Sequence, residues 1–204
     1  KGRLEEIRKH RILYRQKRKK SGIPIVALVG YTNAGKSTLL NALSQADVFV
    51  EDKLFATLDP TTRRLVLPDK SVVLLTDTVG FIRKLPPSIV TAFRATIEEL
   101  TEADVLLQVV DLTCHNATEQ CRIVEEILAD LNLMDKPRIV ALNKADLLLD
   151  NEGTWDESSM ENYSSRQYPA VDENMVLVSA KRKWGLDKLM ELINYTLNKT
   201  AQPV

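Results

Sequence analysis

Gly30-Tyr-Thr-Asn-Ala-Gly-Lys-Ser37 is the stretch that decides the fold expected for this chain. It fits the pattern G-x-x-x-x-G-K-S and lies between an apolar run, Ile23 to Val29, and a segment with helical spacing, Lys36 to Ser44. A strand before this loop and a helix after it are the context that the pattern requires. Its glycines allow the loop to wrap closely around phosphate, and the N–H groups at the helix start face negative charge. The stretch therefore predicts a phosphate-binding loop.

Apolar runs and helical segments alternate on both sides of this loop. The predicted strands are Ile23 to Val29, Leu65 to Leu67, Val72 to Thr76, Val105 to Val110, Arg138 to Leu142 and Met175 to Val178. The predicted helices are Lys36 to Ser44, Ser88 to Leu100, Ala117 to Leu131 and Leu186 to Lys199. We expect a three-layer α/β fold, in which helices cover both faces of a mostly parallel, six-stranded sheet.

Two departures from regular alternation are expected. Pro68 to Ser71 separates the second and third runs and predicts a hairpin, which gives the sheet one antiparallel edge strand. Leu147 to Asp172 is polar and weakly periodic, and is interpreted as an insertion before the last strand.

Two side chains of the loop carry the expected phosphate chemistry. Lys36 would bridge the β and γ phosphates of a nucleotide, and the Ser37 hydroxyl would ligate Mg²⁺. The third predicted strand leads into Asp77-Thr-Val-Gly80, where the Asp77 carboxylate would hold Mg²⁺ through water. The Gly80 N–H would reach the γ-phosphate, and its loop would relax when that phosphate leaves. The residues expected to contact phosphate or metal are Gly30, Tyr31, Thr32, Asn33, Ala34, Gly35, Lys36, Ser37, Thr38, Asp77, Thr78, Val79 and Gly80.

Asn143-Lys-Ala-Asp146 and Ser179-Ala-Lys181 follow two later strands and would select guanine. Asp146 can accept hydrogen bonds from guanine N1–H and from the exocyclic amine. Adenine offers no such pair of donors, so a buried carboxylate would lose its partners with ATP. Asn143 would contact the base or tie its loop to the phosphate-binding loop, while the Lys144 stem would cover one ring face. The expected base contacts are Asn143, Lys144, Ala145, Asp146, Ser179, Ala180 (N–H toward guanine O6) and Lys181.

The formal net charge of zero conceals an asymmetry along the chain. Residues 1–20 hold ten of the 28 basic residues and two of the 28 acidic ones, so the remaining 18 basic and 26 acidic residues give a formal charge of −8. We interpret residues 1–21 as a basic linker helix from a missing N-terminal domain. That helix would suit nucleic-acid phosphates, or would be a solvated face, which the absence of an aromatic stacking pattern favours.

Nothing in the sequence predicts export or insertion into a membrane. It contains no uninterrupted apolar run long enough to span a bilayer, and no apolar signal region follows the basic start. Cys114 and Cys121 lack the spacing of a metal knuckle or redox motif. We expect a cytoplasmic protein without a membrane span, with an organelle as the alternative location.

The motifs together resemble the translation-factor-related P-loop GTPases and, more closely, the HflX family of ribosome-associated GTPases. The resemblance is carried by Gly30-Tyr-Thr-Asn-Ala-Gly-Lys-Ser-Thr-Leu-Leu-Asn41, Phe55-Ala-Thr-Leu-Asp-Pro-Thr61 and Asp77-Thr-Val-Gly-Phe-Ile-Arg-Lys-Leu-Pro86. It implies a P-loop GTPase fold, with a GTP-binding domain at residues 22–200 and a tail at 201–204. It also implies that the chain, expected to be a monomer, binds the large ribosomal subunit and its rRNA, and splits or rescues ribosomes.

The resemblance further implies that a first switch comprises Phe55, Ala56, Thr57, Leu58 and Asp59. Thr57 would give Mg²⁺ a hydroxyl when GTP is bound, with Thr61 and Thr62 as competing candidates. Phe81 stands where many relatives of the superfamily keep a water-orienting glutamine, so slow intrinsic turnover is expected. Asn33 either helps to hold K⁺ beside the phosphates or only shapes the loop. The residues expected to act in catalysis are Lys36, Asn33, Thr57 and Gly80.

Three functions follow from these motifs. The first is an enzyme that converts GTP to GDP and phosphate with Mg²⁺, by positioning and charge stabilisation. The second is a nucleotide-sensing module with little turnover of its own, an interpretation that Phe81 favours. The third is a GTPase in tRNA modification or ribosome assembly, against which the Phe55 to Thr61 motif argues.

Overall fold

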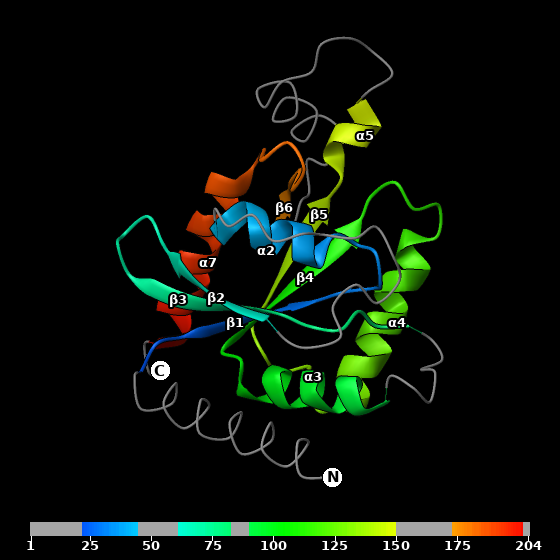
Figure 1. The fold of residues 1–204 in the computed structure, drawn as a ribbon, viewed down its shortest axis with the longest axis horizontal. Coiled ribbons are helices and arrows are strands. Elements are labelled where there is room, and N and C mark those ends of the chain that lie inside the picture. Colours follow the sequence, from blue (N-terminus) through cyan, green and yellow to red (C-terminus); the bar gives the residue numbers. More distant parts are fainter. Residues whose placement is uncertain (1–21, 45–60, 83–89, 150–172, 202–204) are drawn as a thin grey trace.

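The computed structural model describes residues 22–44, 61–82, 90–149 and 173–201, and is built around a six-stranded sheet (Figure 1). Its strands are β1 Ile25–Val29, β2 Thr61–Val66, β3 Val72–Asp77, β4 Val105–Asp111, β5 Arg138–Asn143 and β6 Met175–Leu177. Its helices are α2 Lys36–Ser44, α3 Val90–Glu102, α4 Ala117–Asp130, α5 Ala145–Leu149 and α7 Leu186–Ala201.

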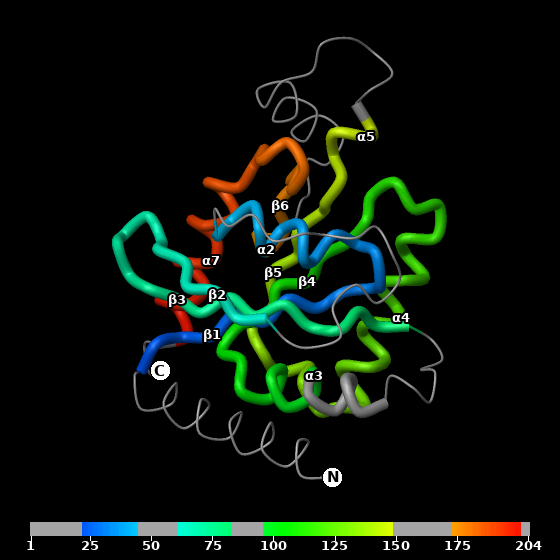
Figure 2. Tube along the Cα trace, viewed as in Figure 1, coloured from blue at the N-terminus to red at the C-terminus, as the bar shows by residue number. Residues whose placement is uncertain are grey.

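The strands lie in the order β2-β3-β1-β4-β5-β6. Only β2 and β3 pair in the antiparallel sense, as the expected hairpin requires, and the other neighbouring strands are parallel. The tube view traces the connections that carry the chain over the faces of the sheet from one parallel strand to the next (Figure 2). The expected α/β fold with one antiparallel edge strand is confirmed.

Alternate residues of each central strand face opposite helix layers. In β1, Val26 and Leu28 belong to the cluster that packs against α2 and α7, whereas Ile25, Ala27 and Val29 belong to the cluster that packs against α3 and α4. Figure 1 shows these two pairs of helices on opposite sides of the sheet. Because a strand turns successive side chains to opposite faces, a continuous apolar run is what a strand covered on both sides requires.

The structure corrects the start of the second predicted strand. β2 begins at Thr61, not Leu65, and pairs along its whole length with β3, from Thr61 opposite Asp77 to Val66 opposite Val72. An edge strand of a sheet is held by its backbone ladder and needs few buried side chains. Leu65 is the only fully buried residue of β2, so an apolar run marks only part of the strand.

The expected start of the polar insertion, at Leu147, is wrong. Leu147 to Leu149 belong to α5, which begins directly after β5. Ala145 packs with Leu177 in a small apolar cluster that Leu148 also contacts, so this short helix is held against the sheet by burial. At the other end of the chain, α7 includes Ala201, which we had expected in the tail.

Several expectations fall on residues outside the described ranges. These are the basic linker helix at 1–21, the first switch at 55–59, most of the polar insertion, at 150–172, and the tail at 202–204. Among the described residues, no helix combines the length and the apolar character that a membrane span needs.

We expect Leu107→Ala to lower the free energy of unfolding by about 3 kcal/mol, because it leaves a cavity between the central strands and the α2–α7 layer. Val66→Ala, at a side chain that is 57% exposed on the edge strand, is the control and should change stability little. Urea unfolding of both variants checks this. Equal losses of unfolding free energy in the two variants would contradict the assignment of Leu107 to the core.

Candidate functional site

The motifs predicted from the sequence meet at one edge of the sheet. The phosphate-binding loop follows β1, Asp77 ends β3, Asn143 ends β5, and Ser179 lies just beyond β6. These four strands all run in the same direction, so their carboxyl ends lie together, where open α/β sheets form their ligand sites.

Glycines in the phosphate-binding loop are required by close backbone contacts. Gly30 has φ 147° and Gly35 has φ 97°. A Cβ added at Gly30 would lie 2.3 Å from the Val109 carbonyl oxygen, and one added at Gly35 would lie 2.3 Å from Asn143 Nδ2. A larger residue at either position would displace the loop from its neighbour.

Asn33 also lies in the left-handed region, with φ 63°. Asn tolerates this conformation better than most residues because its short polar side chain can bond locally. The backbone geometry therefore supplies a reason for Asn33 that needs no bound ion. A role beside K⁺ stays a prediction.

Lys36 is buried at the start of α2 and points back into its own loop. Its Nζ donates to the carbonyl oxygens of Gly30, at 3.2 Å, and Tyr31, at 2.9 Å. Burial lowers the pKa of Lys36 from 10.5 to about 8, and nearby Asp77 opposes this shift. A phosphate arriving here would meet an ammonium group already stripped of most of its water.

Ser37 and Asp77 bring a hydroxyl and a carboxylate oxygen together at the sheet edge. The Ser37 hydroxyl donates to Asp77 Oδ2 at 2.5 Å, although the two residues come from α2 and β3. Hydroxyl and carboxylate oxygens suit Mg²⁺, which usually keeps several waters and takes few protein ligands. Among the described residues, no group of three or more His, Cys, Asp and Glu side chains is placed to hold a metal ion.

Backbone hydrogen bonds hold the segment after Asp77 against the phosphate-binding loop. The Phe81 N–H donates to Gly30 O and the Thr32 N–H donates to Phe81 O, both at 3.0 Å. A Cβ added at Gly80 would lie 2.6 Å from Thr32 Cα, which explains the glycine. From the other side, the Val79 N–H donates to Thr96 Oγ1 of α3 at 3.1 Å.

The side chain of Phe81 turns away from the phosphate-binding loop. It is fully buried in the apolar cluster beneath α3 and α4. This residue therefore serves packing, and its burial explains why a polar group does not stand there.

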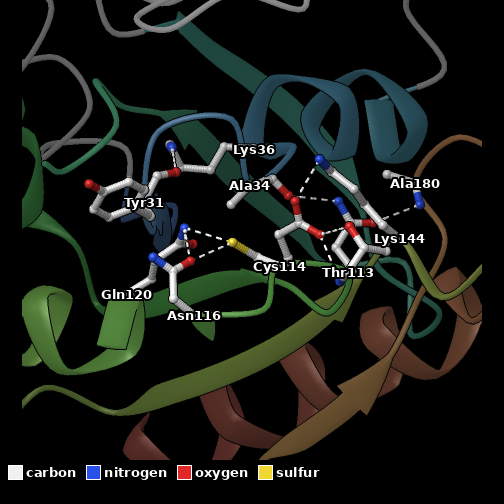
Figure 3. A network of polar contacts seen from close by, with 11 residues as sticks. Tyr31, Ala34, Lys36, Thr113, Cys114, Asn116, Gln120, Lys144 and Ala180 are labelled. Atoms are coloured by element: carbon white, nitrogen blue, oxygen red, sulfur yellow. Dashed lines mark hydrogen bonds and ion pairs between the residues drawn. The ribbon is translucent and has the colours of Figure 1, made fainter. Parts of the chain in front are cut away.

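Asn143 joins the phosphate-binding loop to the loop after β6. Its Nδ2 donates to Ala34 O at 2.9 Å, and its Oδ1 accepts from the Ala180 N–H at 3.0 Å. Figure 3 labels Ala34 and Ala180 within this network of polar contacts. Of the two roles expected for Asn143, the tie between loops is the one that the structure displays.

Asp146 is buried beside Ser179. The Ser179 hydroxyl donates to Asp146 Oδ1 at 2.7 Å and accepts from the Arg182 N–H at 3.0 Å. Ser179 is further fixed by paired backbone bonds with Trp184. The Ser179 hydroxyl thus orients one side of the Asp146 carboxylate. Of the other residues expected to contact the base, Lys181 is exposed and Ala145 packs in the apolar cluster with Leu177.

The structure places two of the three threonines expected as candidates for Mg²⁺. Thr61 lies opposite Asp77 in the β2–β3 ladder, whereas the Thr62 hydroxyl lies 3.0 Å from that of Thr76. Thr78 donates its hydroxyl to Leu28 O, so it braces the sheet edge. Thr57, and Phe55 to Asp59 around it, lie outside the described residues.

Two residues that the motifs do not include lie at the end of β4. Asp111 Oδ2 is 2.7 Å from Lys144 Nζ, and Asp111 Oδ1 accepts two hydrogen bonds from Thr113. The order Asp-Leu-Thr directly after an apolar strand was the available signal, because such a pair commonly closes a side-chain turn.

Comparison with known proteins identifies the family. The sequence model of a family described as 50S ribosome-binding GTPase matches residues 25–144. The chain belongs to this GTPase family. A protein named GTPase HflX from Caldanaerobacter subterraneus subsp. tengcongensis is 52% identical over 201 residues, and its namesake from Escherichia coli strain K12 is 40% identical over 196. The resemblance to HflX expected from the sequence is confirmed.

These matches cover 98% and 96% of this chain, but 43% and 44% of the two HflX proteins. The chain thus spans less than half the length of those relatives.

Among solved structures, a GTP-binding protein from Sulfolobus solfataricus in complex with GDP is 28% identical with a TM-score of 0.63, covering 94% of this chain and 58% of that one. A variant of Aquifex aeolicus Era is also 28% identical, with a TM-score of 0.62, covering 85% and 56%. The expected GTPase fold is therefore confirmed.

The pKa of Lys36 makes a prediction for the nucleotide-free GTPase domain in EDTA. Between a folded pKa of about 8 and an unfolded value of 10.5, the unfolded chain binds more protons, so the Lys36 contribution to unfolding free energy rises with pH. Relative to Lys36→Met, the wild-type chain should gain stability as pH rises from 8 to 10. Urea unfolding at several pH values measures the difference, and a difference independent of pH would contradict the burial of this ammonium group.

Proposed function

We propose that this chain binds GTP with Mg²⁺, hydrolyses it to GDP and phosphate, and uses the change of nucleotide to switch the shape of two loops. One observation carries the proposal. The Asn143 amide bonds both the phosphate-binding loop and the Ala180 loop, so that phosphate and base motifs form one connected site. Membership of a GTPase family supports the same conclusion.

Guanine selection is assigned to Asp146 and the loop of Ala180. The Ser179 hydroxyl orients Asp146, which would accept from guanine N1–H and the exocyclic amine. Ala180 would direct its N–H toward O6, and Lys144 would cover a ring face. Because Asp146 is buried, adenine would leave its carboxylate without donors. The proposed base-contacting residues are Asn143, Lys144, Ala145, Asp146, Ser179, Ala180 and Lys181.

The phosphates and the metal are assigned to the other half of the site. Lys36 would exchange its bonds to Gly30 O and Tyr31 O for phosphate oxygens. Ser37 would ligate Mg²⁺ directly and Asp77 through water, with Thr57 as a further ligand in the GTP state. When bound, the ion would neutralise charge that develops on the phosphates. The proposed contacts here are residues 30–38, 55–59 and 77–80.

Hydrolysis by this domain alone is expected to be slow. Phe81 is buried in the core and cannot orient water, so that role passes to another residue, to an ion such as K⁺ near Asn33, or to a partner. The Gly80 N–H would sense the γ-phosphate. The same burial of Phe81 favours the second candidate, a nucleotide-sensing module whose loop shape is read by its partner.

The partner we infer is the large ribosomal subunit with its rRNA. The family's description names 50S ribosome binding, and the relatives above are named HflX. Ribosome splitting or rescue, a monomeric state and a cytoplasmic location belong to the same proposal. The alternative partners are those of tRNA modification or ribosome assembly.

Asp146→Asn should lower the affinity for GDP by roughly ten- to a hundredfold and raise that for xanthosine diphosphate, because the amide donates where the carboxylate accepted. Titration calorimetry with both nucleotides measures the change. Asp187→Asn, at an exposed position on α7, is the control. Unchanged guanine preference would refute the role of Asp146.

GTP hydrolysis should be markedly faster with purified large ribosomal subunits than without them, and faster in K⁺ than in Na⁺. Phosphate release in Mg²⁺ buffer measures both effects, with Lys36→Ala as the variant that should lose nucleotide binding. Intact GDP binding without stimulation by subunits would favour the sensing module and would place ribosome recognition elsewhere in the full-length protein.

A further inference from the structure

The carboxylate of Asp111 divides its two oxygens between two tasks. Oδ1 accepts from the Thr113 N–H at 2.9 Å and from the Thr113 hydroxyl at 2.6 Å, which fixes the carboxylate at the end of β4. Oδ2 is left facing Lys144 Nζ, at 2.7 Å. The turn therefore presents one oriented oxygen to the lysine.

Lys144 starts from a constrained position on the neighbouring strand. It follows Asn143, which pairs with Asp111 across the β4–β5 ladder, and its backbone has φ 66° in the left-handed region. Its side chain crosses from the end of β5 to the end of β4, close to Thr113 (Figure 3). With four freely rotating stem bonds, a lysine here needs a partner to keep one orientation.

We propose that Asp111 is a positioning residue that holds the Lys144 stem across the face of the guanine ring. The inference rests on the proposed function, in which Lys144 covers the base. Asp111 acts through Lys144 and needs no contact with the nucleotide. Its effect should fall on the lifetime of the bound nucleotide, GDP and GTP alike, because both carry the same base.

Because Asp111 is negatively charged, the direction in which nucleotide affinity changes on its removal tests the inference. A carboxylate near a site for phosphates repels the ligand, so loss of its charge alone would tighten nucleotide binding. If Lys144 acted chiefly through its own charge, removal of Asp111 would also strengthen the attraction between Lys144 and the negatively charged nucleotide. If Asp111 positions Lys144, loss of Asp111 should instead weaken nucleotide binding, because a released lysine no longer covers the base.

The pair is also better protected than an ordinary surface ion pair of this domain. The side chains of Lys144 and Asp111 are 25% and 15% exposed, whereas those of Arg122 and Glu119 on α4 are 53% and 39% exposed. Screening by water and salt is weaker for the less exposed pair. Glu119→Gln therefore provides a matched control at a pair away from the sheet edge.

The test compares Asp111→Asn, Lys144→Met and the double variant in GDP affinity, GDP dissociation rate and GTP turnover. Asn keeps the size of Asp, and its amide oxygen can still accept from Thr113. We expect Asp111→Asn to weaken GDP binding about three- to tenfold, through faster dissociation, as befits a partly buried charged contact. KM for GTP should rise by a similar factor while kcat is retained.

The double variant should bind GDP no more weakly than Lys144→Met alone, since Asp111 acts only through that lysine. Glu119→Gln should leave GDP affinity unchanged. Tighter or unchanged binding by Asp111→Asn would overturn the inference, as would additive losses in the double variant. Failure of the wild-type chain to bind GDP would instead overturn the proposed function itself.

Discussion

A single carboxamide connects the parts of the candidate site. The Asn143 side chain donates to Ala34 O of the phosphate-binding loop and accepts from the Ala180 N–H beyond β6. The backbone carbonyl oxygen of Asn143 accepts from the Leu112 N–H just after β4. A buried amide with its donor and acceptor both used fixes the relative positions of its partners, because either partner could move only by leaving a polar group unpaired. The geometry of three loops therefore depends on this residue, and Gly35 lacks a side chain because the Asn143 amide occupies that space.

The amide can perform this role because the strands beneath it are held rigidly. Each central strand is covered by helices on both faces, with α2 and α7 against one and α3 and α4 against the other. Close packing of this kind limits movement of strand ends to small displacements. Residues that come from distant parts of the sequence, such as Ser37 and Asp77, thus meet within hydrogen-bonding distance.

The segment after β3 is held differently from the half of the site that is proposed to bind the base. Its contacts to the phosphate-binding loop are backbone bonds of Phe81, and α3 reaches it through the Thr96 hydroxyl. Phe81 anchors the segment in the core, and Gly80 lies immediately before that anchor. The segment between Asp77 and Phe81 is thus held by the phosphate-binding loop on one side and by α3 on the other.

The sequence by itself determined the α/β class, the antiparallel edge and the places of the four motifs, because apolar periodicity and loop patterns with Gly, Lys, Asn and Asp are local properties of a chain. It did not reveal the full length of β2, whose polar residues are held by the backbone ladder, nor α5, whose Ala145 packs with Leu177 of β6 in a small apolar cluster. The sequence left Asn143 with two possible roles, and the tertiary structure displays the tie between loops. The partner of Asp146 and the pairing of Asp111 with Lys144 were decided by tertiary structure alone. Each joins residues from different strand ends, and such contacts depend on strand order and register, which no local pattern encodes.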